Sequence, residues 1–148
     1  MEKLKLMLVD DEERFLTTTE KLLKKKGVDV VTASSGGEAL EKLRAHAVNV
    51  VILDVKMPGM DGVATLKEIK RQFPMVEVIM LTGHATVDSA VVGLKSGAVD
   101  YLMKPADLDQ ILEKANDAFS RRMGIEERIR VARMRGLMKS PRDILRNT

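Results

Sequence analysis

The chain has 148 residues, 45% of them hydrophobic, and a net charge of +3, which is the size of one ordinary domain with its own core. It lacks cysteine and has only two histidines, His46 and His84, which excludes a disulfide framework, a thiolate metal site and a zinc cluster. The N-terminal run MEKLKLMLV is a poor signal peptide and no stretch approaches the ~20 apolar residues of a membrane span, so we expect a cytoplasmic protein.

Five short aliphatic runs predict β-strands. In chain order they are Leu4–Val9, Val28–Thr32, Asn49–Leu53, Val76–Leu81 and Val99–Met103. The third and fourth runs are almost continuously apolar, which is typical of parallel strands covered by helices on both faces.

A segment with helical spacing follows each run. The predicted helices are Glu12–Lys26, one opened by Ser35 and Glu38 in capping-box spacing, Gly62–Phe73, one from Thr86 to near Gly97, and one capped by Asp107. The periodicity predicts a buried stripe on each helix, comprising Phe15, Leu16, Thr19, Leu22 and Leu23 on the first and Val87, Ala90, Val91 and Leu94 on the fourth, with Val92 exposed.

Alternating strands and helices with short connections predict an α/β fold, a doubly wound five-stranded parallel sheet. Right-handed crossovers favour the flavodoxin-like strand order 2-1-3-4-5, with a cleft at the carboxyl edge between the first and third strands.

Chemically active side chains follow or end four of these strands. They are Asp10 and Asp11, Asp54, Thr82, and Lys104. Because the carboxyl ends of parallel strands meet at one edge of a sheet, we expect these side chains to converge. Three carboxylates repel one another unless a cation lies between them, and hard oxygen ligands suit Mg2+. The pattern therefore predicts a small divalent metal site.

Asp54 ends the most apolar strand, where a carboxylate is costly unless it is paired or bound to a metal. A carboxylate can also attack phosphorus and form an acyl phosphate. Lys104 and the Thr82 hydroxyl can bind phosphate oxygens. Taken singly, Asp10-Asp11 could cap a helix, Lys104 could be solvated and Thr82 could be a turn residue, but their coincidence at four strand ends favours a site.

The motifs LMLVDDEE, VILDVKMPGMDG, VIMLTGHA and YLMKP occur in this order between residue 4 and about residue 120. In these motifs the chain resembles the receiver domain of bacterial two-component response regulators. The resemblance implies a phosphoprotein in which Asp54 accepts a phosphoryl group from a sensor histidine kinase or a phosphotransfer protein. It also implies a signalling domain rather than an enzyme.

The resemblance assigns a metal site to the acidic residues. Asp11 is expected to bind Mg2+ directly, with Mn2+ as a substitute, and Asp10 to assist through water. Asp54 and the backbone carbonyl of Lys56 would complete the protein ligands.

The resemblance assigns the remaining strand-end residues to phosphate binding and switching. Lys104 and Thr82 would contact the phosphoryl group, and the Lys104-Pro105 peptide bond would be cis. Thr82 and Tyr101 would form the switch pair, altering the surface of the fourth helix, fifth strand and fifth helix.

Two neighbours of the site are expected to tune how long the phosphoryl group lasts. These are Lys56, two residues beyond the acceptor, and His84, two beyond the switch threonine. Our hypothesis is that neither helps water attack efficiently, so the phosphorylated state is long-lived. The alternative for His84 is a solvated loop residue.

The C-terminal segment is expected to be a separate part, with a receiver at 1–120 and a basic helical extension and disordered end at 121–148. Residues 120–148 carry nine Lys/Arg against three Asp/Glu, a net charge of +6 that leaves −3 for residues 1–119. A coiled-coil spacing of three and four residues forms a predicted seam along this helix, namely Ile111, Ala115, Ala118, Arg122, Ile125, Ile129 and Ala132. Arg122 is charged, and Gly124 weakens the helix nearby, so the continuity of the helix is in doubt. A homodimer helix, a basic helix that binds nucleic acid, an anionic membrane or an acidic partner, and a solvated helix all remain open.

Three other functions compete with a stand-alone receiver. A haloacid dehalogenase-type phosphohydrolase requires an alternating DxD at the first strand, whereas this chain has adjacent Asp10-Asp11. A non-phosphorylated receiver-like interaction module would not need the five strand-end residues. A receiver fragment of a longer, ATPase-linked, DNA-binding transcriptional regulator remains the main alternative.

Overall fold

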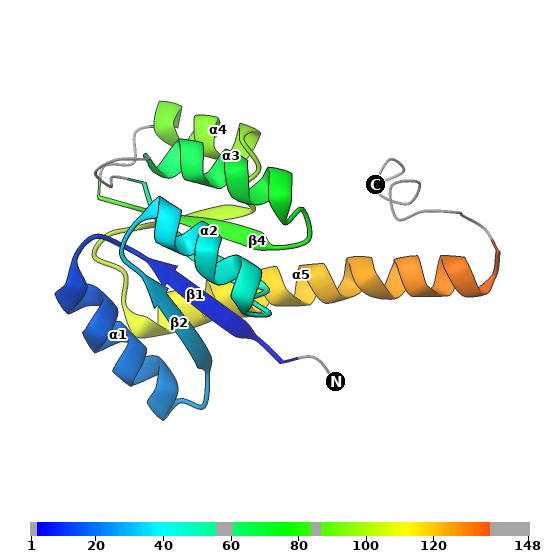
Figure 1. Ribbon diagram of the computed structural model, residues 1–148, viewed down its shortest axis with the longest axis horizontal. Helices are drawn as coiled ribbons and strands as arrows, with labels where there is room; N and C mark the ends of the chain where they lie inside the picture. Colours follow the sequence, from blue (N-terminus) through cyan, green and yellow to red (C-terminus); the bar gives the residue numbers. More distant parts are fainter. Residues whose placement is uncertain (1–2, 56–60, 84–86, 137–148) are drawn as a thin grey trace.

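The computed structural model describes residues 3–55, 61–83 and 87–136. Within them, a parallel sheet of five strands has the order β2-β1-β3-β4-β5 (Figure 1), which confirms the predicted topology. The strands are β1 (Lys5–Val9), β2 (Asp29–Ala33), β3 (Val50–Asp54), β4 (Glu77–Thr82) and β5 (Asp100–Met103). The helices are α1 (Glu13–Lys25), α2 (Gly36–Ala45), α3 (Gly62–Gln72), α4 (Val87–Lys95) and α5 (Leu108–Met134).

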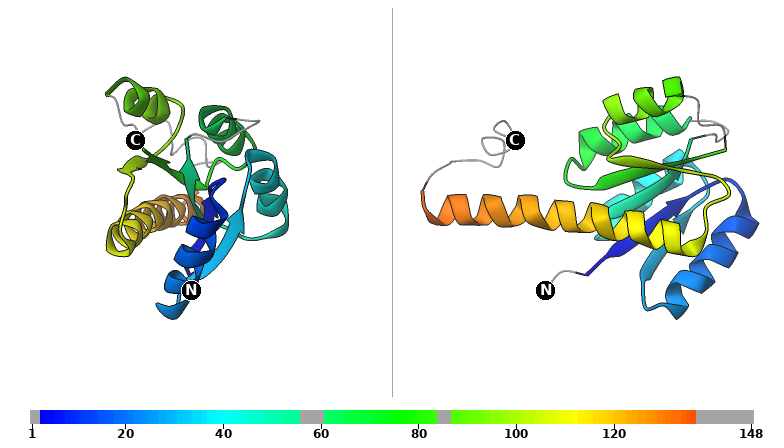
Figure 2. Two further views of the ribbon diagram at one scale, coloured as in Figure 1. Left: turned by 90° about the vertical axis from the view of Figure 1, so that its left-hand side faces the viewer. Right: turned by 180° about the vertical axis from the view of Figure 1, so that it is seen from behind.

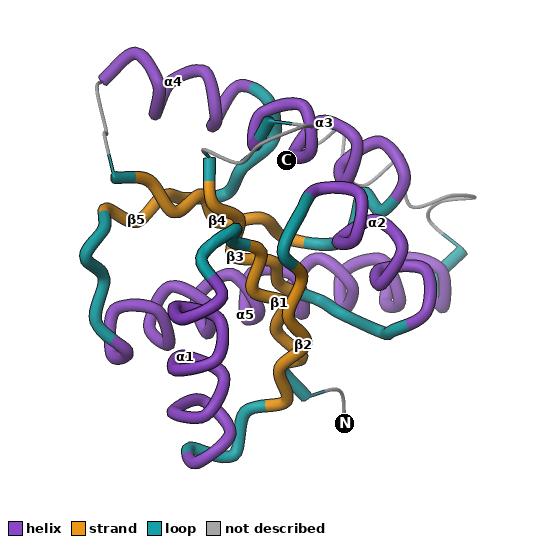
Figure 3. The backbone as a smooth tube through the Cα atoms, turned by 60° about the vertical axis from the view of Figure 1, so that its left-hand side comes forward, coloured by secondary structure: helices purple, strands orange, loops and turns teal. Residues whose placement is uncertain are grey.

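Helices cover both faces of the sheet because successive strand residues point to opposite sides. In β1, Met7 and Val9 enter the core cluster beneath α2 and α3, whereas Leu6 and Leu8 enter the cluster beneath α1 and α5. Figure 3 shows α1 and α5 on one side of the strands and α2, α3 and α4 on the other. The almost continuous apolar runs of the sequence thus supply side chains to two core clusters, one on each face of the sheet.

Side chains cap the N-terminal ends of three helices, α2, α3 and α5. Asp107 with Gln110 forms a complete capping box, as predicted. Ser35 Oγ caps α2 by accepting a hydrogen bond from Glu38 N at 3.1 Å, but the Glu38 carboxylate accepts from Ser34 N and not from Ser35 N, so the predicted box is half formed. Asp61, which was not among the predicted caps, begins α3 by accepting a hydrogen bond from Ala64 N at 2.7 Å. The caps fix where α2, α3 and α5 leave the sheet edge.

Among the side chains that the structure describes, which do not include Val87, the predicted buried stripes are wrong at three positions. On α4, Val91 and Leu94 are 41% and 44% exposed, and on α1, Leu22 is 42% exposed. The face of α4 that meets the sheet contains Gly93, where an added Cβ would lie 1.9 Å from Met80 Cε. A glycine adds nothing to the hydrophobic periodicity, so the periodicity alone predicts the wrong buried face for α4. Val92 is 49% exposed, as predicted.

Helix α5 runs without a break through Gly124 and extends well beyond the sheet (Figures 1 and 2). Arg122, the charged residue on the predicted seam, donates from Nε to the Met75 carbonyl at 2.9 Å and lies 2.9 Å from Glu126 Oε1. Its side chain is only 13% exposed. The hydrogen bond to the loop before β4 gives the guanidinium a partner, so this charged residue does not interrupt the helix.

Replacing Gly124 by Ala should stabilise α5. An added Cβ at this position meets no atom within 4 Å, and alanine in a helix interior is favoured over glycine by about 1 kcal/mol. We expect slower amide hydrogen exchange across residues 120–134 and an unchanged exchange rate in β1. Faster exchange in the variant would show that the glycine is required for a contact on this face.

No helix among the described residues is long and apolar enough to span a membrane.

Candidate functional site at the carboxyl edge of the sheet

Four adjacent strands bring the predicted residues to one edge. Asp10 follows β1, Asp54 ends β3, Thr82 ends β4 and Lys104 follows β5. The pairing of Asp54 with Leu81, and the hydrogen bond from Lys104 N to the Thr82 carbonyl at 2.8 Å, hold these strand ends in register. The convergence expected from the sequence is therefore present in the structure.

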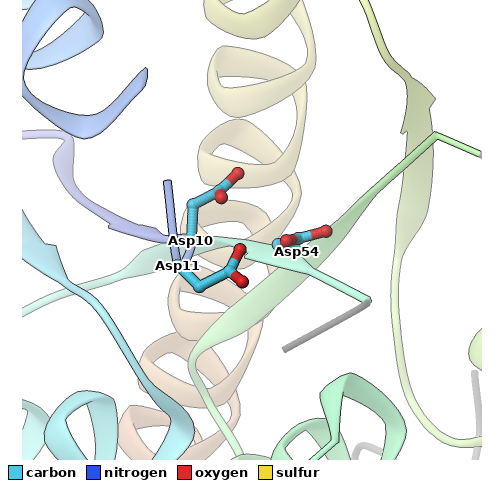
Figure 4. A group of neighbouring side chains, drawn as sticks. All are labelled: Asp10, Asp11 and Asp54. Carbon is cyan, nitrogen blue, oxygen red and sulfur yellow. The ribbon is translucent and has the colours of Figure 1, made fainter. Parts of the chain in front are cut away.

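Three carboxylates form a compact group at this edge (Figure 4). Asp10 is fully buried and Asp54 is 4% exposed, while Asp11 is exposed. One carboxylate oxygen from each lies within 4.8 Å of the others. Buried carboxylates this close together are costly without a compensating cation.

The oxygens of Asp10 have different surroundings. Oδ1 accepts a hydrogen bond from Glu12 N at 2.9 Å, which holds the turn between β1 and α1. Oδ2 is buried and lies 2.9 Å from Lys104 Nζ, an ion pair, but this contact lacks regular hydrogen-bond geometry. Glu12, and neither aspartate, occupies the N-cap position of α1. Neither aspartate is the N-cap residue, so helix capping alone does not account for Asp10-Asp11.

The carboxylate group fits a small divalent cation. All three donors are hard oxygens, they approach from one edge, and the exposed Asp11 leaves the group open to solvent. Within this group, Asp10 Oδ2 is buried and has no hydrogen bond of regular geometry, so this oxygen can coordinate a metal ion. Mg2+ favours such a site because it binds through a few carboxylates and retains waters.

Lys104 supplies the positive charge of the site. Its Nζ lies 2.9 Å from Asp10 Oδ2, 3.7 Å from Asp54 Oδ2 and 3.8 Å from Glu12 Oε1. Burial lowers the pKa of Lys104, but the close ion pair with Asp10 and the negative charges of Asp54 and Glu12 outweigh it and raise the pKa above its usual value. The side chain is therefore an ammonium at neutral pH.

Thr82 and Tyr101 lie on adjacent strands. Thr82 is buried at the end of β4, whereas the Tyr101 side chain on β5 is 37% exposed. Tyr101 is in register with Met80, two residues before Thr82, so the tyrosine is diagonal to the threonine. Thr82 is thus buried at the site edge, while Tyr101 lies at the surface.

Two further expectations concern residues near this edge. As expected, the Lys104-Pro105 peptide bond is cis. Lys56 and His84, the expected lifetime-tuning residues, lie outside the described residues.

One neighbour of the site was not identified as functional from the sequence. Phe15, which the periodicity assigned only to the buried stripe of α1, places its ring centroid 5.5 Å from Lys104 Nζ. No sequence signal distinguishes an aromatic core residue from one that also contacts a lysine 89 positions later, because this contact depends on where the first turn of α1 lies relative to the loop after β5.

Comparison with known families is consistent with this geometry. The model of the response regulator receiver domain matches residues 6–116, which include every described residue of the site. The chain belongs to the response regulator receiver family. It therefore carries a receiver domain of a two-component system, and the matched range contains the strand-end aspartates, Thr82 and Lys104.

Curated relatives of this receiver domain are longer proteins. It is 44% identical over 113 residues to the transcriptional regulatory protein ZraR of Escherichia coli K12, covering 74% of the chain and 26% of the relative. It is 40% identical over 113 residues to the DNA-binding transcriptional regulator NtrC of the same organism, covering 76% and 24%. The chain spans about a quarter of the length of these relatives.

Solved structures share the fold. A CheY-like receiver domain protein from Methanospirillum hungatei aligns with a TM-score of 0.77 and 32% identity, covering 82% of this chain and 98% of that structure. NtrX from Brucella abortus aligns with a TM-score of 0.83 and 30% identity, covering 92% of this chain and 31% of that structure.

Proposed function

We propose that this receiver accepts a phosphoryl group on Asp54 from the phosphohistidine of a sensor histidine kinase or of a phosphotransfer protein, in a Mg2+-dependent reaction. One observation carries the proposal. The Asp54 carboxylate is nearly buried at a strand end, 3.7 Å from the Lys104 ammonium and grouped with Asp10 and Asp11. The nucleophile, the lysine ammonium and the carboxylates that would bind the metal thus lie at one edge of the sheet.

The reaction follows from these groups. A carboxylate oxygen of Asp54 attacks phosphorus, the phosphorus–nitrogen bond breaks, and its electron pair leaves with the imidazole. Lys104 and the Thr82 hydroxyl bind phosphoryl oxygens as charge develops on them. The product is an acyl phosphate on this chain, so the domain is a phosphoacceptor and turns over no separate substrate.

Asp10, Asp11, Asp54 and the Lys56 carbonyl would hold the metal ion. When bound, Mg2+, or Mn2+ in its place, neutralises charge on the phosphoryl oxygens. Asp10 holds the β1–α1 turn by its hydrogen bond from Glu12 N and pairs with Lys104. The same carboxylate therefore supports both the metal site and the phosphate-binding lysine.

Thr82 and Tyr101 are the proposed switch. Phosphorylation adds roughly 1.5 to 2 negative charges at the end of β3, and the Thr82 hydroxyl would move toward them. The space it leaves would be filled by the Tyr101 ring, which is now 37% exposed. The affected α4-β5-α5 surface already exposes apolar side chains, namely Val91, Val92, Leu94, Tyr101 and Met103.

Lys56 and His84 are proposed to leave the phosphoryl group long-lived, because neither is suited to direct a water at the acyl phosphate. Purified phosphoprotein should retain its label for minutes or longer. A half-life of seconds would contradict this proposal.

The α5 extension is the proposed dimer contact, with residues 1–120 as the receiver and 121–148 as a basic extension. The seam residues Ile111, Ala115 and Ala118 pack toward the sheet, and the helix then continues past it. Sedimentation of the full chain against a chain truncated after Arg122 tests this. A dimer that survives truncation would remove the proposal, and retention of the full chain by DNA would instead support a nucleic-acid contact.

A receiver within a longer transcriptional regulator is a second candidate. The observation that favours it is the length of the relatives, of which this chain matches about a quarter. The phosphoacceptor chemistry is the same in both cases.

The direct test is incubation with Mg2+ and a small acyl phosphate, followed by mass measurement of the intact chain. We expect one added phosphoryl group with Mg2+ and none when EDTA removes the metal. A native chain that gains no phosphoryl mass would leave the interaction-module alternative.

A further inference from the structure

The Lys104 ammonium has an aromatic neighbour as well as acidic ones. Its Nζ lies over the Phe15 ring, 5.5 Å from the centroid, while Asp10 Oδ2 and Asp54 Oδ2 lie at 2.9 Å and 3.7 Å. A cation within about 6 Å of a ring centroid is attracted by the negative face of the ring. The contact between Phe15 and Lys104 is therefore favourable.

Phe15 is well placed to restrain a flexible lysine. It lies in the first turn of α1 and packs against the core cluster beneath α1 and α5, so its ring position is fixed by the fold. Phe15, Pro105 and Ala106 line a surface pocket together with Glu12 and Lys104. The four-carbon stem of Lys104 is thus confined by apolar groups, and its charged end remains at the carboxylates.

We propose that Phe15 is a positioning residue for Lys104 in phosphoryl transfer to Asp54. The ring keeps the ammonium beside Asp54 before the phosphodonor arrives, so the incoming phosphoryl oxygens meet a charge that is already in place. Phe15 itself touches no reacting atom. The inference rests on the proposed phosphoacceptor function of Asp54.

Two substitutions at Phe15 separate the ring from its apolar bulk. Phe15→Leu keeps an apolar side chain and removes the ring, whereas Phe15→Tyr keeps the ring. Phe119→Leu is the matched control, because Phe119 packs against the same core cluster but lines a pocket with Lys3 and Gly27 at the amino edge of the sheet. Thermal unfolding of each variant verifies that it is folded.

The first measurement is the rate of phosphorylation by a small acyl phosphate with Mg2+. A small donor needs no protein docking surface, so loss of a kinase contact cannot affect this rate. We expect Phe15→Leu to be about two- to fivefold slower than the native chain, which is the size expected for losing one cation–π contact. Phe15→Tyr and Phe119→Leu should keep the native rate.

The second measurement follows Lys104 directly. In the native chain the ring current of Phe15 should shift the Lys104 Hε resonances upfield, and this shift should persist in Phe15→Tyr and Phe119→Leu but vanish in Phe15→Leu. Affinity for fluoroberyllate with Mg2+, a phosphoryl mimic, should fall in Phe15→Leu, while affinity for Mg2+ alone should not change.

The outcomes distinguish the proposed phosphoacceptor function of Asp54 from the positioning role of Phe15. A native chain that takes up no phosphoryl group overturns the proposed function. A native chain that is phosphorylated at the same rate as Phe15→Leu overturns the positioning role alone. Equal slowing in Phe15→Tyr or Phe119→Leu would show an effect of core packing and would also overturn it.

Discussion

Replacing Asp54 by Asn should abolish phosphorylation by a small acyl phosphate and, in the absence of Mg2+, make the folded domain more stable. The amide is isosteric but is not a nucleophile toward phosphorus. Its neutrality removes one charge from three carboxylates that lie within 4.8 Å of one another. Removing a nearly buried charge that is crowded by like charges should raise the free energy of unfolding by roughly 1–2 kcal/mol.

Mg2+ should reduce this difference in stability. A ligand that binds only the folded state stabilises it by mass action, by about 2.7 kcal/mol at a hundredfold excess over Kd. The native chain should gain this stability on addition of Mg2+, and Asp54→Asn should gain less, because one oxygen ligand has lost its charge. Thermal unfolding with EDTA and with Mg2+ measures both effects.

Asp61→Asn is the matched control for this substitution. Asp61 caps α3 through its side chain, and asparagine is an equally good N-cap residue, so stability and phosphorylation should both stay close to native. Equal phosphoryl uptake by Asp54→Asn and the native chain would assign the acceptor to another residue. A lower stability of Asp54→Asn without metal would show that the carboxylate is stabilised more by Lys104 than it is destabilised by Asp10 and Asp11.

Gly62→Ala should cause the largest loss of stability among the glycine substitutions considered. A Cβ at Gly62 would lie 2.4 Å from the Cα and 2.5 Å from the carbonyl oxygen of Val55, and these are backbone atoms that cannot rotate away. Gly62 N also donates a hydrogen bond to that carbonyl at 3.0 Å. Relieving the overlap must move α3 or the residue directly after Asp54, at a cost of about 3 kcal/mol.

Chemical denaturation of Gly62→Ala and Gly37→Ala measures this effect against a matched control. Gly37 lies in the first turn of α2 with no atom within 4 Å of an added Cβ, so Gly37→Ala should be neutral or stabilise by up to about 1 kcal/mol. Gly62→Ala should also be phosphorylated more slowly, since Val55 adjoins Asp54. Comparable stabilities for the two variants would contradict the close approach of α3 to the end of β3.

The sheet was predictable because its signals are local. Continuous aliphatic runs, capping residues such as Ser35 and Asp107, and short connections specify five strand-helix units, and parallel connectivity then limits the strand order. The helix faces were less predictable. Periodicity assigned Val91 and Leu94 to the core, but the close approach of α4 at Gly93 exposes both.

Arg122 illustrates a different failure of local reasoning. In the sequence it interrupts an apolar seam, and with Gly124 it suggests a broken helix. In the structure its guanidinium is satisfied by the Met75 carbonyl and by Glu126, so α5 continues. The partner carbonyl lies 47 positions away, beyond the reach of any helical pattern.

The sequence by itself determined the fold class, the strand order and the identity of the strand-end residues, because hydrophobic period and the shared edge of parallel strands follow from local pattern and connectivity. Only the tertiary structure decided that Asp10 is fully buried and ion-paired to Lys104, that Gly62 abuts Val55, and that Phe15 lies beneath the lysine. These are contacts between separate elements, and their distances depend on how closely helices pack on the sheet.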